Sequence, residues 1–247
     1  MKWLSPLCLF LAYSLFGFAQ SGQTPNGWTY EVLQSGSGSY LQATQGALTH
    51  NRLINSSGET IVSTYAIGIP DYQLMSDLST AFQQAFSVMQ TGGRYRFTIP
   101  VNDFKAAVKS GSKLSLSGAT VVWEMELIEI LPPLPDGAQE VSKVLKAQGI
   151  EAAFQTYLAL FNNQKAYFGE WENNQVGYFF LNKGDFDKAI QVFKANTNRY
   201  PNSSNAHDSL GEAYYKAGAL EKAKEHYQKS LAINPQNENA QQMLRKL

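Results

Sequence analysis

Few polar side chains in this chain have the type and spacing that catalysis by nucleophile or metal requires. The three histidines, His50, His207 and His226, stand alone, with no cysteine or carboxylate at metal-ligand spacing. The single cysteine, Cys8, lies inside an apolar N-terminal run, so we expect no disulfide, no thiol nucleophile and no thiolate metal site in the mature protein. We therefore predict neither a metal nor a cofactor.

Two short motifs match catalytic signatures by chance. Gly36-Ser37-Gly38 lacks the third glycine and the following helix of a dinucleotide loop. Ser110-Gly111-Ser112-Lys113 matches the Ser-x-x-Lys of penicillin-recognising enzymes, but the partner motifs of those enzymes are missing.

Aromatic residues are the stronger candidates for a site. Residues 76–89 place an apolar stripe on one face of a predicted helix that Ser76 caps and Gly92-Gly93 ends, with Leu78, Phe82, Phe86 and Met89 on the stripe. Trp123 belongs to a run in which apolar residues alternate with Val122, Glu124 and Glu126, the pattern of a strand with one buried face. We expect the helix to cover that face, with Phe82, Trp123 and Phe97 supplying much of the core.

The remaining strand-like runs lie before residue 131 and predict an α+β domain of five strands around one short helix. They cover residues 28–33, 47–54, 60–67 and 94–99. A segment with three prolines, residues 131–137, then interrupts any regular structure and marks a domain boundary. We assign residues 26–132 to the first domain and 138–247 to a helical second domain.

An internal repeat of 34 residues runs through the second domain. Val176-Gly177, Phe180, Gly184, Ala189, Phe193 and Pro201 align with Leu210-Gly211, Tyr214, Gly218, Ala223, Tyr227 and Pro235. Small residues in this pattern let paired helices approach closely, and the prolines end each unit. The pattern is similar to tetratricopeptide (TPR) repeats. We expect repeats at about 170–203 and 204–237, a degenerate hairpin at 139–163 and a capping helix at 236–247.

The N-terminus has the features of a secretory signal peptide. Lys2 precedes an apolar run from Leu4 to Phe18, and Gly17 and Ala19 are small residues at the cleavage positions. The alternative is a membrane anchor, but the run is shorter than the roughly 20 residues that a span needs. We favour cleavage near Ala19, export to the periplasm or beyond, and no stable membrane insertion.

The charge balance argues against nucleic acid as a partner. Twenty basic and twenty acidic residues cancel, so no overall field attracts an anionic polymer. Any partner must be recognised locally.

The first domain resembles the FKBP-type peptidyl-prolyl isomerases over residues 27–130. The resemblance rests on three segments: Gly118-Ala119-Thr120-Val121-Val122-Trp123-Glu124-Met125-Glu126-Leu127, which is similar to the closing strand of that family; Val32-Leu33-Gln34-Ser35-Gly36-Ser37-Gly38, similar to its opening strand and turn; and Gly92-Gly93-Arg94-Tyr95-Arg96-Phe97-Thr98-Ile99-Pro100, similar to the strand after its short helix. The resemblance implies an FKBP-like antiparallel sheet wrapped on one short helix.

The resemblance also implies a pocket for a prolyl peptide. A prolyl bond isomerises without a nucleophile when its imide is held twisted in a dry apolar pocket, which lowers a barrier of about 18–20 kcal/mol. Phe82 matches the aromatic floor of the family's pocket and Trp123 a wall. Further lining is implied for Tyr72, Leu74, Leu78, Ser79 and Ile61.

Three family positions are replaced in this chain. Asn51 stands where the family has a pocket tyrosine, Val62 where it has a buried aspartate, and Lys105 near a second tyrosine. Two interpretations remain open. The chain is an exported isomerase-like folding factor that acts on prolyl clients, or it is an inactive scaffold in which Phe82 and Trp123 are only core residues.

The TPR resemblance implies a groove for a protein partner. Repeats that clamp an acidic chain terminus carry lysine and asparagine on the groove face, whereas this chain has Asn174, Tyr178, Asp208 and Glu212 there. We expect no carboxylate clamp. The alternative is that the helical domain only packs against the first domain.

Overall fold

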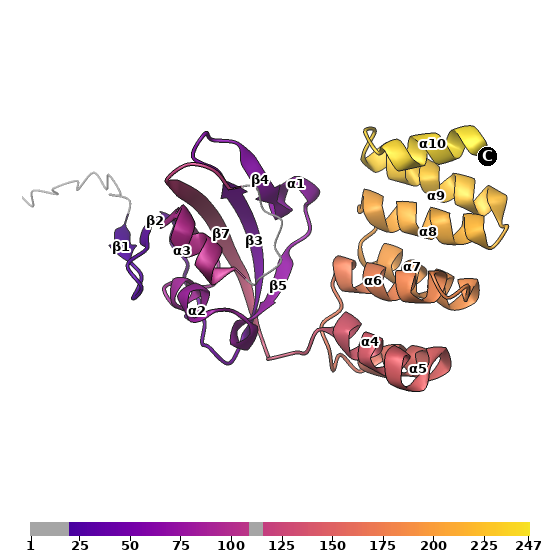
Figure 1. Ribbon diagram of the computed structural model, residues 1–247, viewed down its shortest axis with the longest axis horizontal. Helices are drawn as coiled ribbons and strands as arrows, with labels where there is room; N and C mark the ends of the chain where they lie inside the picture. The colour runs from indigo at the N-terminus through magenta and orange to yellow at the C-terminus, as the bar shows by residue number, and fades with distance from the viewer. Residues whose placement is uncertain (1–19, 109–115) are drawn as a thin grey trace, which may run out of the picture.

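The computed structural model describes residues 20–108 and 116–247. The predicted signal peptide, Cys8 and the whole Ser-x-x-Lys motif lie outside these residues. Figure 1 shows an N-terminal sheet with short helices, followed by a stack of helical hairpins. The predicted α+β domain with an all-α repeat domain after it is confirmed.

The sheet is antiparallel and follows the order β1-β2-β6-β7-β3-β4, with β5 also paired to β3. Its strands are β1 (Ser21–Gln23), β2 (Thr29–Gln34), β3 (Gly46–Ile54), β4 (Thr60–Ser63), β5 (Asp71–Leu74), β6 (Arg94–Pro100) and β7 (Thr120–Leu131). The long strand β7 lies between β6 and β3, and Trp123 pairs with Phe97 on one side and with Leu53 on the other. This register brings the buried face of three strands under one helix.

That helix is α2 (Thr80–Phe86), and it is shorter than the sequence predicts. Residues 76–79 do not continue it: a 3₁₀ turn, η1 (Met75–Asp77), comes first, and the extended Ser79 is the N-cap in place of Ser76. The amide of Gln83 reaches back to the carbonyl oxygen of Leu78 at 3.0 Å, which stabilises this break. The predicted stripe still forms, since Phe82, Phe86 and Met89 are all buried.

A second correction concerns residues 60–67, which the pattern predicts as one strand. The strand β4 ends at Ser63, and α1 (Thr64–Ile67) follows. Ser63 caps this turn through the backbone N–H of Ala66, while the buried Thr64 hydroxyl accepts the N–H of Asn51 at 2.7 Å. Side-chain bonds to the backbone therefore overrule the β propensity of the run. The strands β1 and β5 and the helix α3 (Val101–Ala107) were not predicted.

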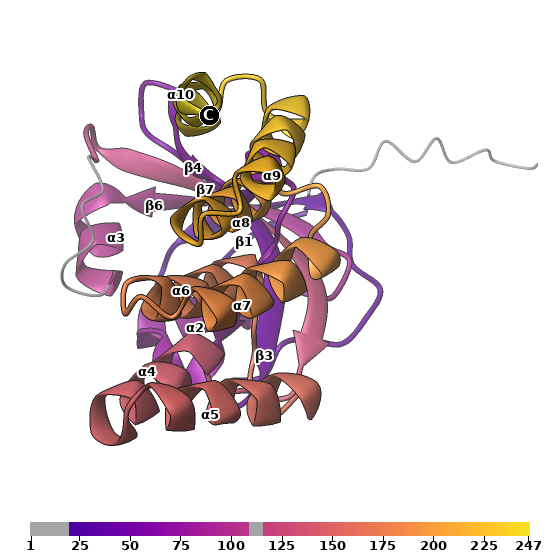
Figure 2. The same cartoon turned by 90° about the vertical axis from the view of Figure 1, so that its right-hand side faces the viewer.

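The helical part stacks in chain order, as both views show (Figures 1 and 2). It contains α4 (Gly137–Gln148), α5 (Ile150–Asn162), α6 (Glu170–Leu181), α7 (Phe186–Arg199), α8 (Ser204–Lys216), α9 (Leu220–Ile233) and α10 (Glu238–Lys246). Gly177 lies against the ring of Phe193, and Gly211 occupies the equivalent place against Tyr227. The small residues do allow close helix approach, as predicted.

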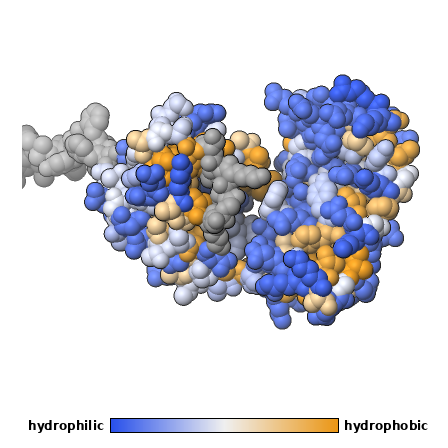
Figure 3. All heavy atoms as spheres, viewed as in Figure 1, coloured by the Kyte–Doolittle hydropathy of each residue, from blue (hydrophilic) through white to orange (hydrophobic). Residues whose placement is uncertain are grey.

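Figure 3 shows the surface of one face, on which hydrophilic residues cover much of the helical part. None of the helices in the described ranges is long and apolar enough to cross a bilayer. The same ranges contain no group of three or more His, Cys, Asp or Glu side chains suited to a metal ion.

Candidate functional site

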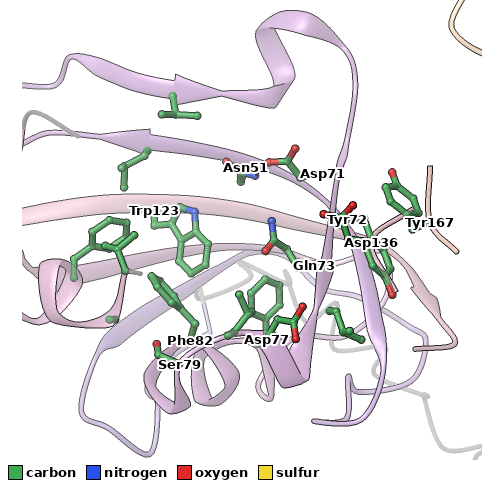
Figure 4. A pocket seen from close by; sticks show the side chains of 18 of the residues that line it. Asn51, Asp71, Tyr72, Gln73, Asp77, Ser79, Phe82, Trp123, Asp136 and Tyr167 are labelled. Carbon is green, nitrogen blue, oxygen red and sulfur yellow. Dashed lines mark hydrogen bonds between the residues drawn. The ribbon is translucent and has the colours of Figure 1, made fainter. Parts of the chain in front are cut away.

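A cavity of about 490 Å³ opens between the sheet, α2 and the start of the helical part (Figure 4). Its floor is apolar and combines side chains from β3, α2, α3 and β7, namely Leu53, Phe82, Phe86, Phe104 and Trp123. The volume lies within the range that small-molecule and peptide side-chain pockets occupy. Within residues 20–108 and 116–247, no side chain fills this cavity.

Phe82 is at the centre of the aromatic floor. Its ring makes edge contacts with Trp123 at 5.1 Å, with Phe104 at 5.6 Å and with Trp28 at 5.6 Å between centroids. Phe82 is 8% exposed, and Trp123 is half-buried beside it. Both residues therefore support the core and also line the cavity, so the two interpretations of these residues are not exclusive. Phe104, which the sequence did not single out, is the third wall.

The replaced family positions lie in different places. Asn51 and Val62 line the cavity, and Val62 is 42% exposed. Ile61 is next to Val62 on the strand and so faces the opposite way, into the core cluster. Ile61 and Lys105 are not among the described lining residues.

Asn51 has a carboxylate neighbour that the sequence did not reveal. Its amide donates to Oδ2 of Asp71 at 3.1 Å, and both residues line the cavity (Figure 4). Asp71 belongs to β5, a strand that was not predicted. A carboxylate acceptor thus reaches the pocket from a different strand than the one carrying Val62.

Leu74, Leu78 and Ser79 line the cavity near α2. The hydroxyl oxygen of Ser79 is buried and has no hydrogen-bond partner within the described part of the chain. A buried hydroxyl without a partner costs free energy.

Tyr72 lines the cavity but also joins the two parts of the molecule. Its ring stacks on Tyr167 with centroids 4.3 Å apart and an angle of 18° between the planes. Its hydroxyl accepts the N–H of Leu134 at 2.9 Å and donates to the Leu134 carbonyl oxygen at 3.1 Å. Gly46 leaves the space that this ring occupies.

The loop around Tyr167 fixes the chain that leaves the sheet. The N–H of Tyr167 donates to Pro135, and the N–H of Gly137 donates to Tyr167, both at 2.9 Å. The proline-rich segment is therefore bound at its end instead of being a free linker, and it places α4 and α6 at the mouth of the cavity.

Four carboxyl side chains line the cavity: Asp71, Asp77, Asp136 and Glu172. Burial raises the pKa of Glu172 to about 7, and the nearby carboxylates of Asp136 and Asp71 add to the shift. These residues come from distant segments, so no sequence spacing could have grouped them.

Of the four groove-face residues of the repeats, Tyr178, Asp208 and Glu212 are held by hydrogen bonds within the helical part. Tyr178 donates to Glu212 at 2.9 Å, and the side chains of Asn237 and Asn239 donate to Asp208 at 3.1 and 2.8 Å. Asn174 is buried. The lysine-and-asparagine arrangement of a carboxylate clamp is not formed by these four positions.

The three histidines contact neighbouring side chains outside the cavity. His207 and His226 face each other with Nδ1 atoms 3.1 Å apart, and burial together with the charge of His207 lowers the pKa of His226 to about 4. His50 stacks on Tyr65 and contacts the hydroxyl of Thr64 at 3.1 Å. None of the three lines the cavity.

Comparison with known proteins supports the repeats directly. Tetratricopeptide repeat models match residues 175–203 and 204–237. A curated relative, the BBSome complex member BBS4 of Bos taurus, is 37% identical over 65 residues, which are 26% of this chain and 12% of that protein. The chain thus spans about an eighth of that relative and carries tetratricopeptide repeats.

Two solved structures are similar to larger parts of the chain. A peptidyl-prolyl cis-trans isomerase from Pseudomonas syringae pv. tomato is 19% identical with a TM-score of 0.39, covering 45% of this chain and 80% of that one. A multi-domain immunophilin from Arabidopsis thaliana is 13% identical with a TM-score of 0.38, covering 86% and 96%. These likenesses concern the fold.

Proposed function

We propose that residues 26–132 form an FKBP-type domain that binds prolyl segments of protein clients, and that residues 138–247 hold a protein partner. The observation that carries this proposal is the open cavity floored by Phe82, Phe104 and Trp123. Such a floor suits a proline ring, which is apolar and flat-sided, and it excludes water from the bond next to it.

The pocket can serve either as an isomerase site or as a binding site without catalysis. A dry aromatic site favours the twisted imide over either planar form, because the twisted form has lost amide resonance and is less polar. Possible hydrogen-bonding groups are the Ser79 hydroxyl and the Asn51–Asp71 pair. The family's tyrosine and aspartate positions hold Asn51 and Val62, which supports the alternative of a binding scaffold without isomerase activity.

The cellular setting belongs to the same proposal. Cleavage near Ala19 would release the protein as an exported folding factor, periplasmic or secreted. A partner in the repeats would then bring the first domain to its clients, since linked binding sites raise the effective concentration of each other's ligands.

The test is the cis/trans exchange rate of a Leu-Pro peptide, measured by NMR with residues 20–247. An isomerase accelerates exchange, and Phe82→Ala and Trp123→Ala remove the effect. Leu33→Ala, an exposed residue outside the cavity, is the matched control.

Binding without acceleration identifies the scaffold. In that case Asn51→Tyr with Val62→Asp should create exchange activity where the parent has none. If the peptide is not bound and its exchange is not accelerated at the highest peptide concentration, the proposed function is rejected.

A further inference from the structure

The cavity has an uneven charge distribution along its length. The aromatic floor lies at one end, while Asp71, Asp136 and Tyr167 lie toward the other (Figure 4). Asp77, the last residue of η1, also lines the cavity. Of the described residues that line the cavity, four are carboxyl groups and none is lysine, arginine or histidine. The whole chain is neutral, so this is a local feature.

The four carboxyl groups are not neutralised by ion pairs within the described residues. Asp71 accepts the amide of Asn51, Asp136 caps α4 by accepting from Gln139 at 3.0 and 2.9 Å, and Glu172 accepts the N–H of Gly169 at 3.0 Å. None of them forms a salt bridge with another residue of the described ranges. Neutral donors orient these oxygens but leave their negative charge to act on the cavity.

Half of this acidic wall belongs to the helical part. Asp136 is the N-cap of α4 and Glu172 lies in the first turn of α6, whereas Asp71 and Asp77 come from β5 and η1. The Tyr72–Tyr167 stack and the bonds of Tyr167 to Pro135 and Gly137 hold the two halves together. The mouth of the pocket is therefore a composite of both domains.

We infer that this composite pocket selects prolyl segments with a lysine or arginine beside the proline. The inference rests on the proposed function. The proline ring occupies the floor at Phe82 and Trp123, and the cationic side chain of a neighbouring residue extends to the acidic end. A long aliphatic stem with a terminal charge fits this path, because the stem covers apolar surface while the charge meets the carboxylates. An acidic neighbour would meet like charge.

The test uses three fluorescent peptides that differ only in the residues next to a Leu-Pro pair: lysine, alanine or glutamate. Affinities are measured by fluorescence polarisation at pH 8, where Glu172 is ionised. We expect the lysine peptide to bind about tenfold more tightly than the alanine peptide and the glutamate peptide to bind most weakly. Raising NaCl from about 0.05 M to about 0.5 M should weaken binding of the lysine peptide and leave the affinity of the alanine peptide unchanged.

Two double variants locate the selecting charges. Asp136→Asn with Glu172→Gln keeps the helix caps but removes the helical half of the wall, and Asp71→Asn with Asp77→Asn removes the sheet half. Each should reduce the ratio of lysine-peptide affinity to alanine-peptide affinity severalfold. Glu140→Gln is the matched control, because this carboxyl lies on α4 outside the cavity and pairs with Lys143.

The outcomes separate the two proposals. Equal affinity for the lysine and alanine peptides overturns the charge selection while leaving the proposed function in place. Full lysine preference in the Asp136→Asn, Glu172→Gln variant overturns the composite site. No binding of any peptide overturns both, and circular dichroism of each variant confirms that it is folded.

Discussion

Glu124 is the most heavily constrained ionised residue of the sheet. It lies on the face of β7 opposite the pocket and is 3% exposed, with Arg52 at 2.6 Å from β3 and Arg96 at 2.8 Å from β6. Burial alone would raise its pKa, but the hydrogen bonds of Arg96 and Arg52 outweigh burial and hold the pKa below its usual range. The period-two pattern predicted the strand but not that its outer face buries an ion-paired carboxylate.

We predict that Glu124→Gln lowers the free energy of unfolding at pH 7 by about 1–3 kcal/mol, since two arginines lose their charged acceptor. The lowered pKa means that this stabilisation is present above the ordinary glutamate pKa and is lost as pH falls through the folded value. Urea unfolding at pH 7 and pH 3 measures both effects. Glu129→Gln, an exposed glutamate on the same strand, is the control. Equal loss in the two variants would contradict the role of the arginine pair.

Glu172 has the opposite pH behaviour. Its pKa is raised to about 7, because it is buried near Asp136 and Asp71, so the folded protein favours the protonated form. Its effect on stability is most favourable below the ordinary glutamate pKa, weakens as pH rises, and levels off above pH 7. We predict that Glu172→Gln gains stability relative to the parent by on the order of 1–2 kcal/mol between pH 5 and pH 8. Thermal melts of both proteins across this pH range test the prediction. A stability difference between the two proteins that stays constant with pH would contradict the shifted pKa.

At the level of elements, close packing of the helix pairs in the repeats depends on Gly177 and Gly211. The space left for a side chain differs between these two positions. A Cβ at Gly177 would overlap the ring of Phe193, which is fully buried, whereas a Cβ at Gly211 would lie 3.0 Å from the ring of Tyr227. The repeat pattern identified both positions from sequence spacing, but only the packing distinguishes them.

We predict that Gly177→Ala destabilises the protein by about 1–3 kcal/mol, because Phe193 must move. Gly211→Ala should be nearly neutral, since a small adjustment is offset by the better helix propensity of alanine, worth up to about 1 kcal/mol. Urea unfolding of the two variants gives the comparison. A larger loss for Gly211→Ala would refute this packing difference.

Element boundaries show what sequence patterns leave undetermined. Periodicity located β2, β3, β6, β7 and most helices, because each buries one continuous face. It failed at residues 60–67 and 76–79, where side chains of Ser63, Thr64 and Gln83 bond to backbone groups and end the regular structure. Periodicity placed Phe82 and Trp123 on the buried face, and the resemblance to the FKBP-type family implied that they line a pocket. The polar part of the candidate site was not predicted, because Asp71, Asp136 and Glu172 meet only through the tertiary fold.

At the scale of the whole molecule, one aromatic contact sets the position of the first helical hairpin. Tyr167 stacks on Tyr72 and bonds to both sides of Asp136 through its backbone. We predict that Tyr167→Ala loosens the junction while both domains remain folded, because the stack contributes about 0.5–1.5 kcal/mol and the backbone bonds remain. Small-angle X-ray scattering should show a larger radius of gyration. Tyr40→Ala, an exposed tyrosine of the first domain outside the stack, is the control, and an unchanged radius for Tyr167→Ala would argue against the contact.

Every function proposed for this protein requires a guest to reach the aromatic floor. The most direct measurement is an NMR titration of the indole N–H signals of the tryptophans with a Leu-Pro peptide and with a Leu-Ala peptide of otherwise identical sequence. We predict that the Trp123 signal shifts with the prolyl peptide only, while the signal of Trp171, which is 62% exposed in the first turn of α6 and does not line the cavity, stays in place. An unmoved Trp123 signal at saturating prolyl peptide, or equal shifts with the two peptides, would contradict it.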